Sequence, residues 1–300
     1  MTGNTSTDLR WVDAGGVKID EEDRGLVYDL QTLVDRRRML GLFGGISAAA
    51  LLTACSGGST SPGATAASTP SASGSGSATV SASSTGTGSA TGDLVEVPDE
   101  TGGPFPADGS NGPDVLADSG IVRTDIRSSF GSSTTTAAGV PLTVRLTVRD
   151  AATGDALSGA AVYVWHCDQA GNYSLYSAAA ADQNYLRGVQ QVDAVGTATF
   201  STIFPGCYPG RWPHIHFEVY GSLTDATGSG PIVKTSQIAL PKEACEAAYA
   251  TSGYQSSVGA LADSSLAGDQ VFGDDGGIHQ LATMSGDAAA GYSAVLTIAV

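Results

Sequence analysis

Short runs of alternating apolar and polar residues follow one another through the second half of the chain. Leu142–Arg149 alternates strictly, which is the period of a strand with one buried face. Ala161–Asp168 is more apolar and therefore predicts a more central strand. The same reasoning predicts further strands over Thr197–Phe204, His214–Tyr220, Ile232–Leu240 and Ala294–Val300.

Turn residues separate these runs, as at Asp150–Asp155 and Pro205–Gly206. One short helix is predicted over Pro241–Ala250, because a proline opens it and acidic residues occupy its first turn. Many short strands joined by turns predict an all-β fold. We expect an antiparallel β-sandwich of immunoglobulin- or transthyretin-like type, with long loops and one short helix.

Residues 1–55 have the pattern of an export signal. Arg36, Arg37 and Arg38 precede an uncharged apolar run, Met39–Ala54, which is short and glycine-rich for a membrane span but suits a signal segment. The arginines resemble a twin-arginine export signal. The end of the run, Leu52-Thr53-Ala54-Cys55, resembles the lipobox of bacterial lipoproteins, in which the cysteine is lipidated. We therefore expect a protein exported and lipid-anchored through Cys55 on the outer face of the cell membrane.

Residues 56–92 consist almost entirely of Ser, Gly, Ala and Thr with a few prolines. Such a composition buries too little apolar surface to offset the entropy of ordering, so it predicts a flexible tether. Residues 93–300 then form the one predicted folded domain. The formal net charge of −16 argues against a nucleic-acid partner and leaves the lipid anchor as the only expected membrane contact.

Candidate chemistry is concentrated around one predicted strand. His214 and His216 are two residues apart, so both imidazoles point to one side of the strand, while Ile215, Phe217 and Val219 point to the other. Tyr208 lies just before this strand, on a loop bounded by proline and glycine, and Tyr173 follows the Ala161–Asp168 strand. From these residues alone, an exposed polar strand face with two unrelated aromatic residues remains an alternative to a metal site.

Phenol ligands would narrow the choice of metal. A phenol ordinarily loses its proton only near pH 10, so a bound phenolate requires a strongly Lewis-acidic cation. Hard oxygen ligands favour ferric iron over zinc or copper(I).

Four segments together resemble the intradiol ring-cleavage dioxygenases, such as protocatechuate 3,4-dioxygenase and catechol 1,2-dioxygenase. The resemblance extends from about Gly139 to the C-terminus, and its most specific part is the order and spacing of residues from Tyr208 to His216. The segments are Trp165–Asp168, Gly171–Ser174, Tyr185–Gln190 and Ile203–Tyr220.

The resemblance implies a non-haem Fe(III) centre ligated by Tyr173, Tyr208, His214 and His216. It further implies that O2 opens a catechol-type ring between its two hydroxyls to give a cis,cis-muconate-type dicarboxylate. Tyr208 is expected to leave the metal when substrate binds, and Tyr173 to stay. Arg211 is expected to lie beside the substrate ring and to stabilise negative charge that develops there.

Several alternatives remain open. A copper- or zinc-binding β-sandwich lipoprotein built on His214 and His216 would not need Tyr173, and a non-catalytic tethered binding module would need none of these residues. Cys207 and Cys245 either form a disulfide or remain two buried thiols. Glu100–Phe105 is a candidate for the rim of the pocket. A homo-oligomer is compatible with the sequence.

Overall fold

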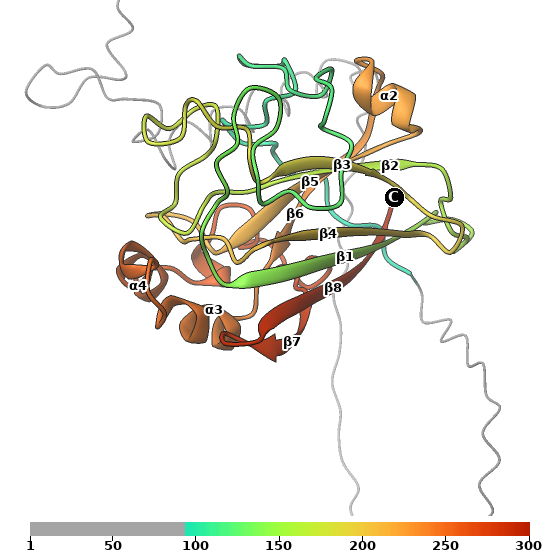
Figure 1. The fold of residues 1–300 in the computed structure, drawn as a ribbon. Coiled ribbons are helices and arrows are strands. Elements are labelled where there is room, and N and C mark those ends of the chain that lie inside the picture. The colour runs from blue at the N-terminus through green and yellow to red at the C-terminus, as the bar shows by residue number, and fades with distance from the viewer. Residues whose placement is uncertain (1–93) are drawn as a thin grey trace, which may run out of the picture.

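The computed structural model describes residues 94–300, which form two packed four-stranded β-sheets (Figure 1). One sheet has the strand order β4-β1-β8-β7 and the other has the order β3-β2-β5-β6. The strands are β1 (Pro141–Arg149), β2 (Ala161–Trp165), β3 (Arg187–Gln191), β4 (Thr197–Ile203), β5 (His214–Tyr220), β6 (Ile232–Ala239), β7 (Thr283–Asp287) and β8 (Gly291–Ala299). The helices are α2 (Leu223–Thr227), α3 (Lys242–Tyr249), α4 (Gln255–Ala262) and the 3-10 helix η3 (Leu266–Gly268).

The first sheet shows the predicted half-buried pattern. In β1, Leu142, Val144, Leu146 and Val148 are buried in the core between the sheets, and the residues between them are partly or fully exposed. β1 pairs antiparallel with β4, but it pairs parallel with β8. The expected antiparallel sandwich is therefore confirmed except at this one parallel pair, which joins a strand early in the domain to the last strand.

The two central strands of the second sheet, β2 and β5, are buried on both faces. All five residues of β2 and all seven of β5 are buried. Ile215, Phe217 and Val219 enter the core between the sheets, as predicted, so His214 and His216 lie on the outer face. Loops from residues 107–121 and around Tyr173 cover that outer face and form a second apolar cluster with it (Figure 1). The loops exclude water from a sheet face that would otherwise be exposed.

Most predicted elements are present, and the helix predicted at Pro241–Ala250 is α3. The strand predicted over Ala161–Asp168 ends earlier, at Trp165. Two strands were not predicted, β3 and β7, because their sequences RGVQQ and TMSGD lack apolar alternation. The prediction of a single helix was also incomplete, because α2, α4 and η3 are present as well.

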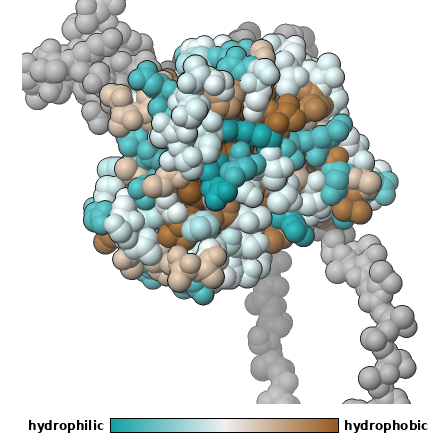
Figure 2. Space-filling model, in the orientation of Figure 1, coloured by the Kyte–Doolittle hydropathy of each residue, from teal (hydrophilic) through white to brown (hydrophobic). Residues whose placement is uncertain are grey.

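The expectations for the signal, the tether and Cys55 fall on residues outside the part that the structure describes. Within residues 94–300, none of the helices combines the length and the apolar character that crossing a membrane requires. On the face shown in Figure 2, hydrophobic residues form small separate patches among polar ones. On this face, the hydrophobic residues are distributed as on an ordinary globular domain.

Gly206 holds together the two loops that carry Tyr173 and Tyr208. Its N–H donates to the carbonyl of Asp168 at 2.9 Å, and a Cβ at this position would lie 2.7 Å from that carbonyl oxygen and 2.9 Å from the backbone nitrogen of Gly171. These are backbone atoms, so they cannot be relieved by a side-chain rotation.

We therefore expect Gly206→Ala to lower the free energy of unfolding by roughly 1–3 kcal/mol, the usual cost of overpacking. Gly259→Ala on α4 is the matched control, because a Cβ there meets nothing within 4 Å; it should leave stability unchanged or raise it by up to about 1 kcal/mol. Urea denaturation of both variants measures the difference. Equal stability of the two variants would show that the two loops are not tightly packed at Gly206.

Candidate active site

His214 and His216 meet at the start of β5 on its outer face. Their Nε2 atoms are 3.1 Å apart. The Nδ1 of His214 lies 2.5 Å from the carbonyl oxygen of Trp212, which can only accept, so Nδ1 carries the proton. The Nε2 of His214 is then left with a lone pair that faces His216. This tautomer is the one that a metal ligand requires.

Both imidazoles are neutral near pH 7. Burial, followed by the positive charge of Arg211, lowers the pKa of His214, and burial followed by His214 and Arg211 lowers that of His216. Each side chain is only 2% exposed. The site therefore offers uncharged nitrogen donors rather than imidazolium groups.

The two predicted tyrosines reach the same point from separate loops. The phenol oxygen of Tyr208 lies 3.1 Å from Nε2 of His214, and that of Tyr173 lies 3.4 Å from the same atom. The two phenol oxygens are 3.3 Å apart. The structure thus brings together all four residues that the sequence singled out as ligands, although they come from three different parts of the chain.

Local turns hold each tyrosine in place. Asp168 accepts hydrogen bonds from the backbone N–H groups of Ala170 and Asn172, which closes the turn before Tyr173. The N–H of Tyr173 donates to the hydroxyl of Ser177 at 2.9 Å. On the other loop, the N–H of Cys207 donates to the hydroxyl of Ser257 at 2.9 Å. Tyr173 is buried, whereas Tyr208 is half-buried next to the exposed Pro209.

The chemistry of the donors fits a highly charged metal ion. Burial, followed by repulsion from Tyr208, raises the pKa of Tyr173 well above 10, so its phenolate requires a strong cation nearby. Among residues 94–300, no group of three or more His, Cys, Asp and Glu side chains is arranged to hold a metal. The donors gathered at this site are the two phenol oxygens and the two imidazole nitrogens.

Arg211 is fixed beside the histidines by a buried ion pair. Its Nε donates to Asp269 at 3.1 Å, and a terminal nitrogen donates to the amide oxygen of Gln237 at 2.6 Å. The other terminal nitrogen lies 3.5 Å from Nε2 of His214. Burial opposes the ionisation of Asp269, but Arg211 and the N–H of Trp212 outweigh it, so the pKa of Asp269 is lowered. A fixed positive charge therefore lies beside His214.

Comparison with known proteins shows what this domain is similar to. Residues 111–227, which contain Tyr173, Tyr208, His214 and His216, match a family model described as Dioxygenase. The fold is similar to that of an intradiol ring-cleavage dioxygenase from Tetranychus urticae, with 24% identity, 69% of this chain and 94% of that chain covered, and a TM-score of 0.54. Residues 111–227 thus match a dioxygenase family model, and the described domain has the fold of an intradiol ring-cleavage dioxygenase.

A second solved structure is similar over the same share of this dioxygenase. It is the dioxygenase domain of a dioxygenase and carbohydrate-binding protein fusion from Streptomyces sp. SirexAA-E, with 26% identity, 69% and 98% of the two chains covered, and a TM-score of 0.45. No curated protein sequence matches the chain.

The segment Glu100–Pro106, here called the strap, crosses the site. Gly103 has a φ of +70°, and a Cβ there would lie 3.2 Å from Cε1 of His216, so glycine is needed for close approach. The ring of Phe105 packs 4.8 Å from that of Tyr173. The carbonyl of Thr101 accepts from Gln237 at 2.9 Å. The two glycines before a proline are the local signal for this segment, but its contacts with distant residues could not be read from the sequence.

The remaining candidates have supporting roles or none. Cys207 and Cys245 are both free thiols, so the disulfide considered from the sequence is not formed. Their thiol groups lie 3.5 Å from the carbonyl of Arg211 and 3.8 Å from that of Leu240, respectively. Glu218, on the same face as the histidines, accepts a hydrogen bond from the phenol of Tyr220 at 2.7 Å.

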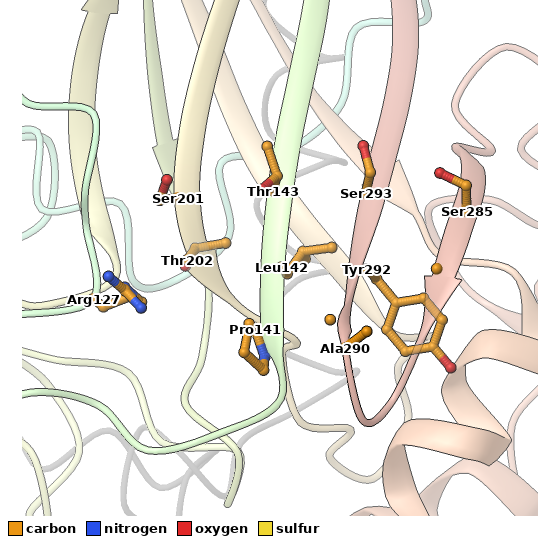
Figure 3. A pocket seen from close by; sticks show the side chains of 12 residues that line it. Arg127, Pro141, Leu142, Thr143, Ser201, Thr202, Ser285, Ala290, Tyr292 and Ser293 are labelled. Carbon is orange, nitrogen blue, oxygen red and sulfur yellow. The ribbon is translucent and has the colours of Figure 1, made fainter.

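A separate pocket of about 330 Å³ lies on the outer face of the other sheet (Figure 3). Hydroxyl side chains of four neighbouring strands line it in one row, namely Ser201, Thr143, Ser293 and Ser285. Its lining includes no imidazole, thiol or carboxylate. It therefore lacks the donors found at the candidate active site.

Glu100 makes the dioxygenase sensitive to pH at one end of the strap. Burial, followed by repulsion from Asp274, raises the pKa of Glu100 from 4.5 to about 8. Between these two pH values the folded protein keeps a proton that the unfolded chain has already released. The contribution of Glu100 to stability is therefore complete below pH 4.5 and is lost as the pH rises to about 8.

We expect Glu100→Gln to raise the melting temperature relative to the wild type at pH 8, with little difference at pH 4.5. Glu243→Gln, at an exposed position on α3, is the control and should change neither value. Thermal unfolding across this pH range measures the effect. If Glu100→Gln and the wild type show parallel profiles, Glu100 does not titrate in this window.

Proposed function

We propose that this dioxygenase binds Fe(III) through Tyr173, Tyr208, His214 and His216 and uses O2 to cleave a catechol-type ring between its two hydroxyls. The product would be a cis,cis-muconate-type dicarboxylate. The observation that carries the proposal is the convergence of two phenol oxygens and two imidazole nitrogens within 3.1–3.4 Å of their nearest partners.

Charge balance supports iron in its ferric state. Two phenolates and two neutral imidazoles leave a ferric ion with one net positive charge, which a buried site tolerates better than three. Hard oxygen donors also match ferric iron better than softer metals. When bound, the iron would supply the Lewis acidity that lowers the pKa of a catechol and activates its ring toward O2.

The two tyrosines are suited to different tasks. Tyr173 is 1% exposed and lies under Phe105, so it has little room to move. Tyr208 is half-buried, and the exposed residues Pro209 and Gly210 follow it. We assign Tyr208 to leave the metal when catechol binds, and to receive a substrate proton on its phenol oxygen. Tyr173 would remain in place.

Arg211 would act on charge that develops on the substrate. Asp269 and Gln237 hold its guanidinium so that one nitrogen faces His214. A cation already held in place needs no reorganisation during the reaction, which is how preorganised charge lowers a barrier.

The visible spectrum tests the iron site directly. We expect protein loaded with Fe(III) to show a tyrosinate charge-transfer band, and that band should move to longer wavelength when catechol is added without O2. Tyr173→Phe should remove or strongly weaken the band. Tyr292→Phe, which removes a phenol on β8 in the other sheet, is the control and should keep it.

Admitting ¹⁸O2 to the catechol complex should then place both oxygen atoms in the dicarboxylate product, as mass spectrometry can show. A protein that stays colourless after iron loading would contradict the iron assignment. Such a protein that instead bound copper or zinc through His214 and His216, with no effect of Tyr173→Phe, would favour the alternative metal site. If it bound no metal, it would favour a binding module.

We also propose that the chain is exported and anchored by a lipid on Cys55. The proposal is supported by the arginines at 36–38, the apolar run Met39–Ala54 and the residues Leu52–Ala54 before the cysteine. In a bacterial host, the wild type should fractionate with membranes and incorporate labelled fatty acid, whereas Cys55→Ser should lose the label. Labelling of Cys55→Ser equal to that of the wild type would contradict the assignment.

A further inference from the structure

Arg187 lies at the first position of β3, on the same sheet face as the histidines. It pairs with Trp165 of β2, and Trp165 pairs in turn with His216 of β5. The rings of Trp165 and His216 stack at 4.9 Å with an interplanar angle of 7°. Arg187 is only 1% exposed. A guanidinium therefore lies buried two strands away from a proposed iron ligand.

The guanidinium joins two separate segments of the chain. Its Nε donates to the hydroxyl of Ser174 at 3.0 Å, and one terminal nitrogen donates to the carbonyl of Ser174 at 2.9 Å. The other terminal nitrogen donates to the carbonyl of Pro106 at 3.1 Å and to the phenol of Tyr163 at 3.2 Å. Tyr163 itself donates to the carbonyl of Pro106 at 2.8 Å.

Both segments reach the site within one residue of these contacts. Ser174 directly follows Tyr173, and Pro106 directly follows Phe105, whose ring packs on Tyr173. Tyr176 adds a further link, because its ring lies 5.5 Å from the guanidinium of Arg187 and its hydroxyl accepts from the N–H of Ala107 at 2.8 Å. Arg187 thus links the Tyr173 loop to the strap through four hydrogen bonds of its own.

The acceptors around Arg187 within residues 94–300 are all neutral oxygens. A guanidinium does not lose its proton in proteins, so the charge stays positive despite burial. A buried cation whose hydrogen bonds go to neutral groups is costly unless a nearby anion balances it. Glu218 is a buried carboxylate on the same sheet face, and it pairs in register with Tyr163, whose phenol accepts from Arg187.

We propose that Arg187 is a positioning residue of this dioxygenase, holding the Tyr173 loop and the strap at a fixed separation over the two histidines. The expected effect of Arg187 on catalysis rests on the proposed function. Its expected effect on the Tyr173 loop and the strap does not. The planar fork of arginine is essential here, because it donates to two segments at once. Lysine carries the charge on a single nitrogen and cannot reproduce that geometry.

The test compares Arg187→Met, Arg187→Lys and a matched control, Arg123→Met. Arg123 is half-buried, its guanidinium donates to the backbone carbonyls of Arg187, Asn184 and Ser128, and it lies 4.6 Å from the ring of Phe130. Its contacts are therefore of the same kind but do not include the strap or the Tyr173 loop. All three variants are expected to unfold at a lower temperature than the wild type.

Hydrogen exchange of the metal-free protein gives the first readout. Both Arg187 variants should exchange amides in residues 103–107 and 173–177 at least tenfold faster than the wild type, and Arg123→Met should not. Unchanged exchange in Arg187→Met, or equal acceleration in Arg123→Met, would overturn the proposal. This readout decides the matter even if the wild type takes up no iron.

The iron-loaded protein gives the second readout. Per bound iron, Arg187→Met and Arg187→Lys should show a shifted or weakened charge-transfer band and a kcat at least tenfold lower. Arg123→Met should retain the wild-type band and a kcat within twofold. Wild-type values in the Arg187 variants would overturn the positioning role, whereas a wild type without a band would contradict the proposed function instead.

Discussion

The site depends on one strand that is buried on both faces. β5 pairs with β2 on one side and β6 on the other, and its residues Ile215, Phe217 and Val219 fill the core between the sheets. Burial of each such side chain is worth about 1.5–3 kcal/mol, so the strand cannot rotate or slip without a large loss of stability. The alternate residues His214 and His216 are consequently held in fixed directions. Packing of one face of β5 against the core therefore fixes the positions of the two imidazoles on its other face.

The carboxylate of Asp269 connects the guanidinium of Arg211 to the backbone that orients His214. Asp269 accepts from the guanidinium of Arg211 at 3.1 Å and from the N–H of Trp212 at 2.6 Å. The carbonyl of Trp212 in turn receives the Nδ1 proton of His214. Asp269 therefore offsets the buried charge of Arg211 and also holds the residue that fixes the tautomer of His214. Loss of Asp269 would disturb both, because the two contacts share one anion.

The sequence predicts those parts of the molecule in which local pattern and burial agree. β1 and β5 follow from alternation, and the convergence of Tyr173, Tyr208, His214 and His216 follows from a resemblance carried by their spacing. β3 could not be predicted in this way, because RGVQQ becomes a strand only through pairing with β2.

The strap could not be predicted from local pattern either. Its contacts with His216 and Gln237 join residues more than 100 positions apart, and no local pattern encodes such a contact. The state of Cys207 and Cys245 likewise depends on where the fold places them.

The two tyrosines of the candidate site differ in their surroundings. Tyr173 is buried among Phe105, the Ser177 hydroxyl and the loop tied to Arg187, so any movement of its ring would disrupt several contacts at once. Tyr208 shares the same donor cluster but is partly exposed, and a glycine at φ +85° follows it two residues later. Under the proposed function, the ligand that stays and the ligand that leaves carry the same phenol group. They are distinguished by the packing around them, which opposes movement of one ring and permits movement of the other.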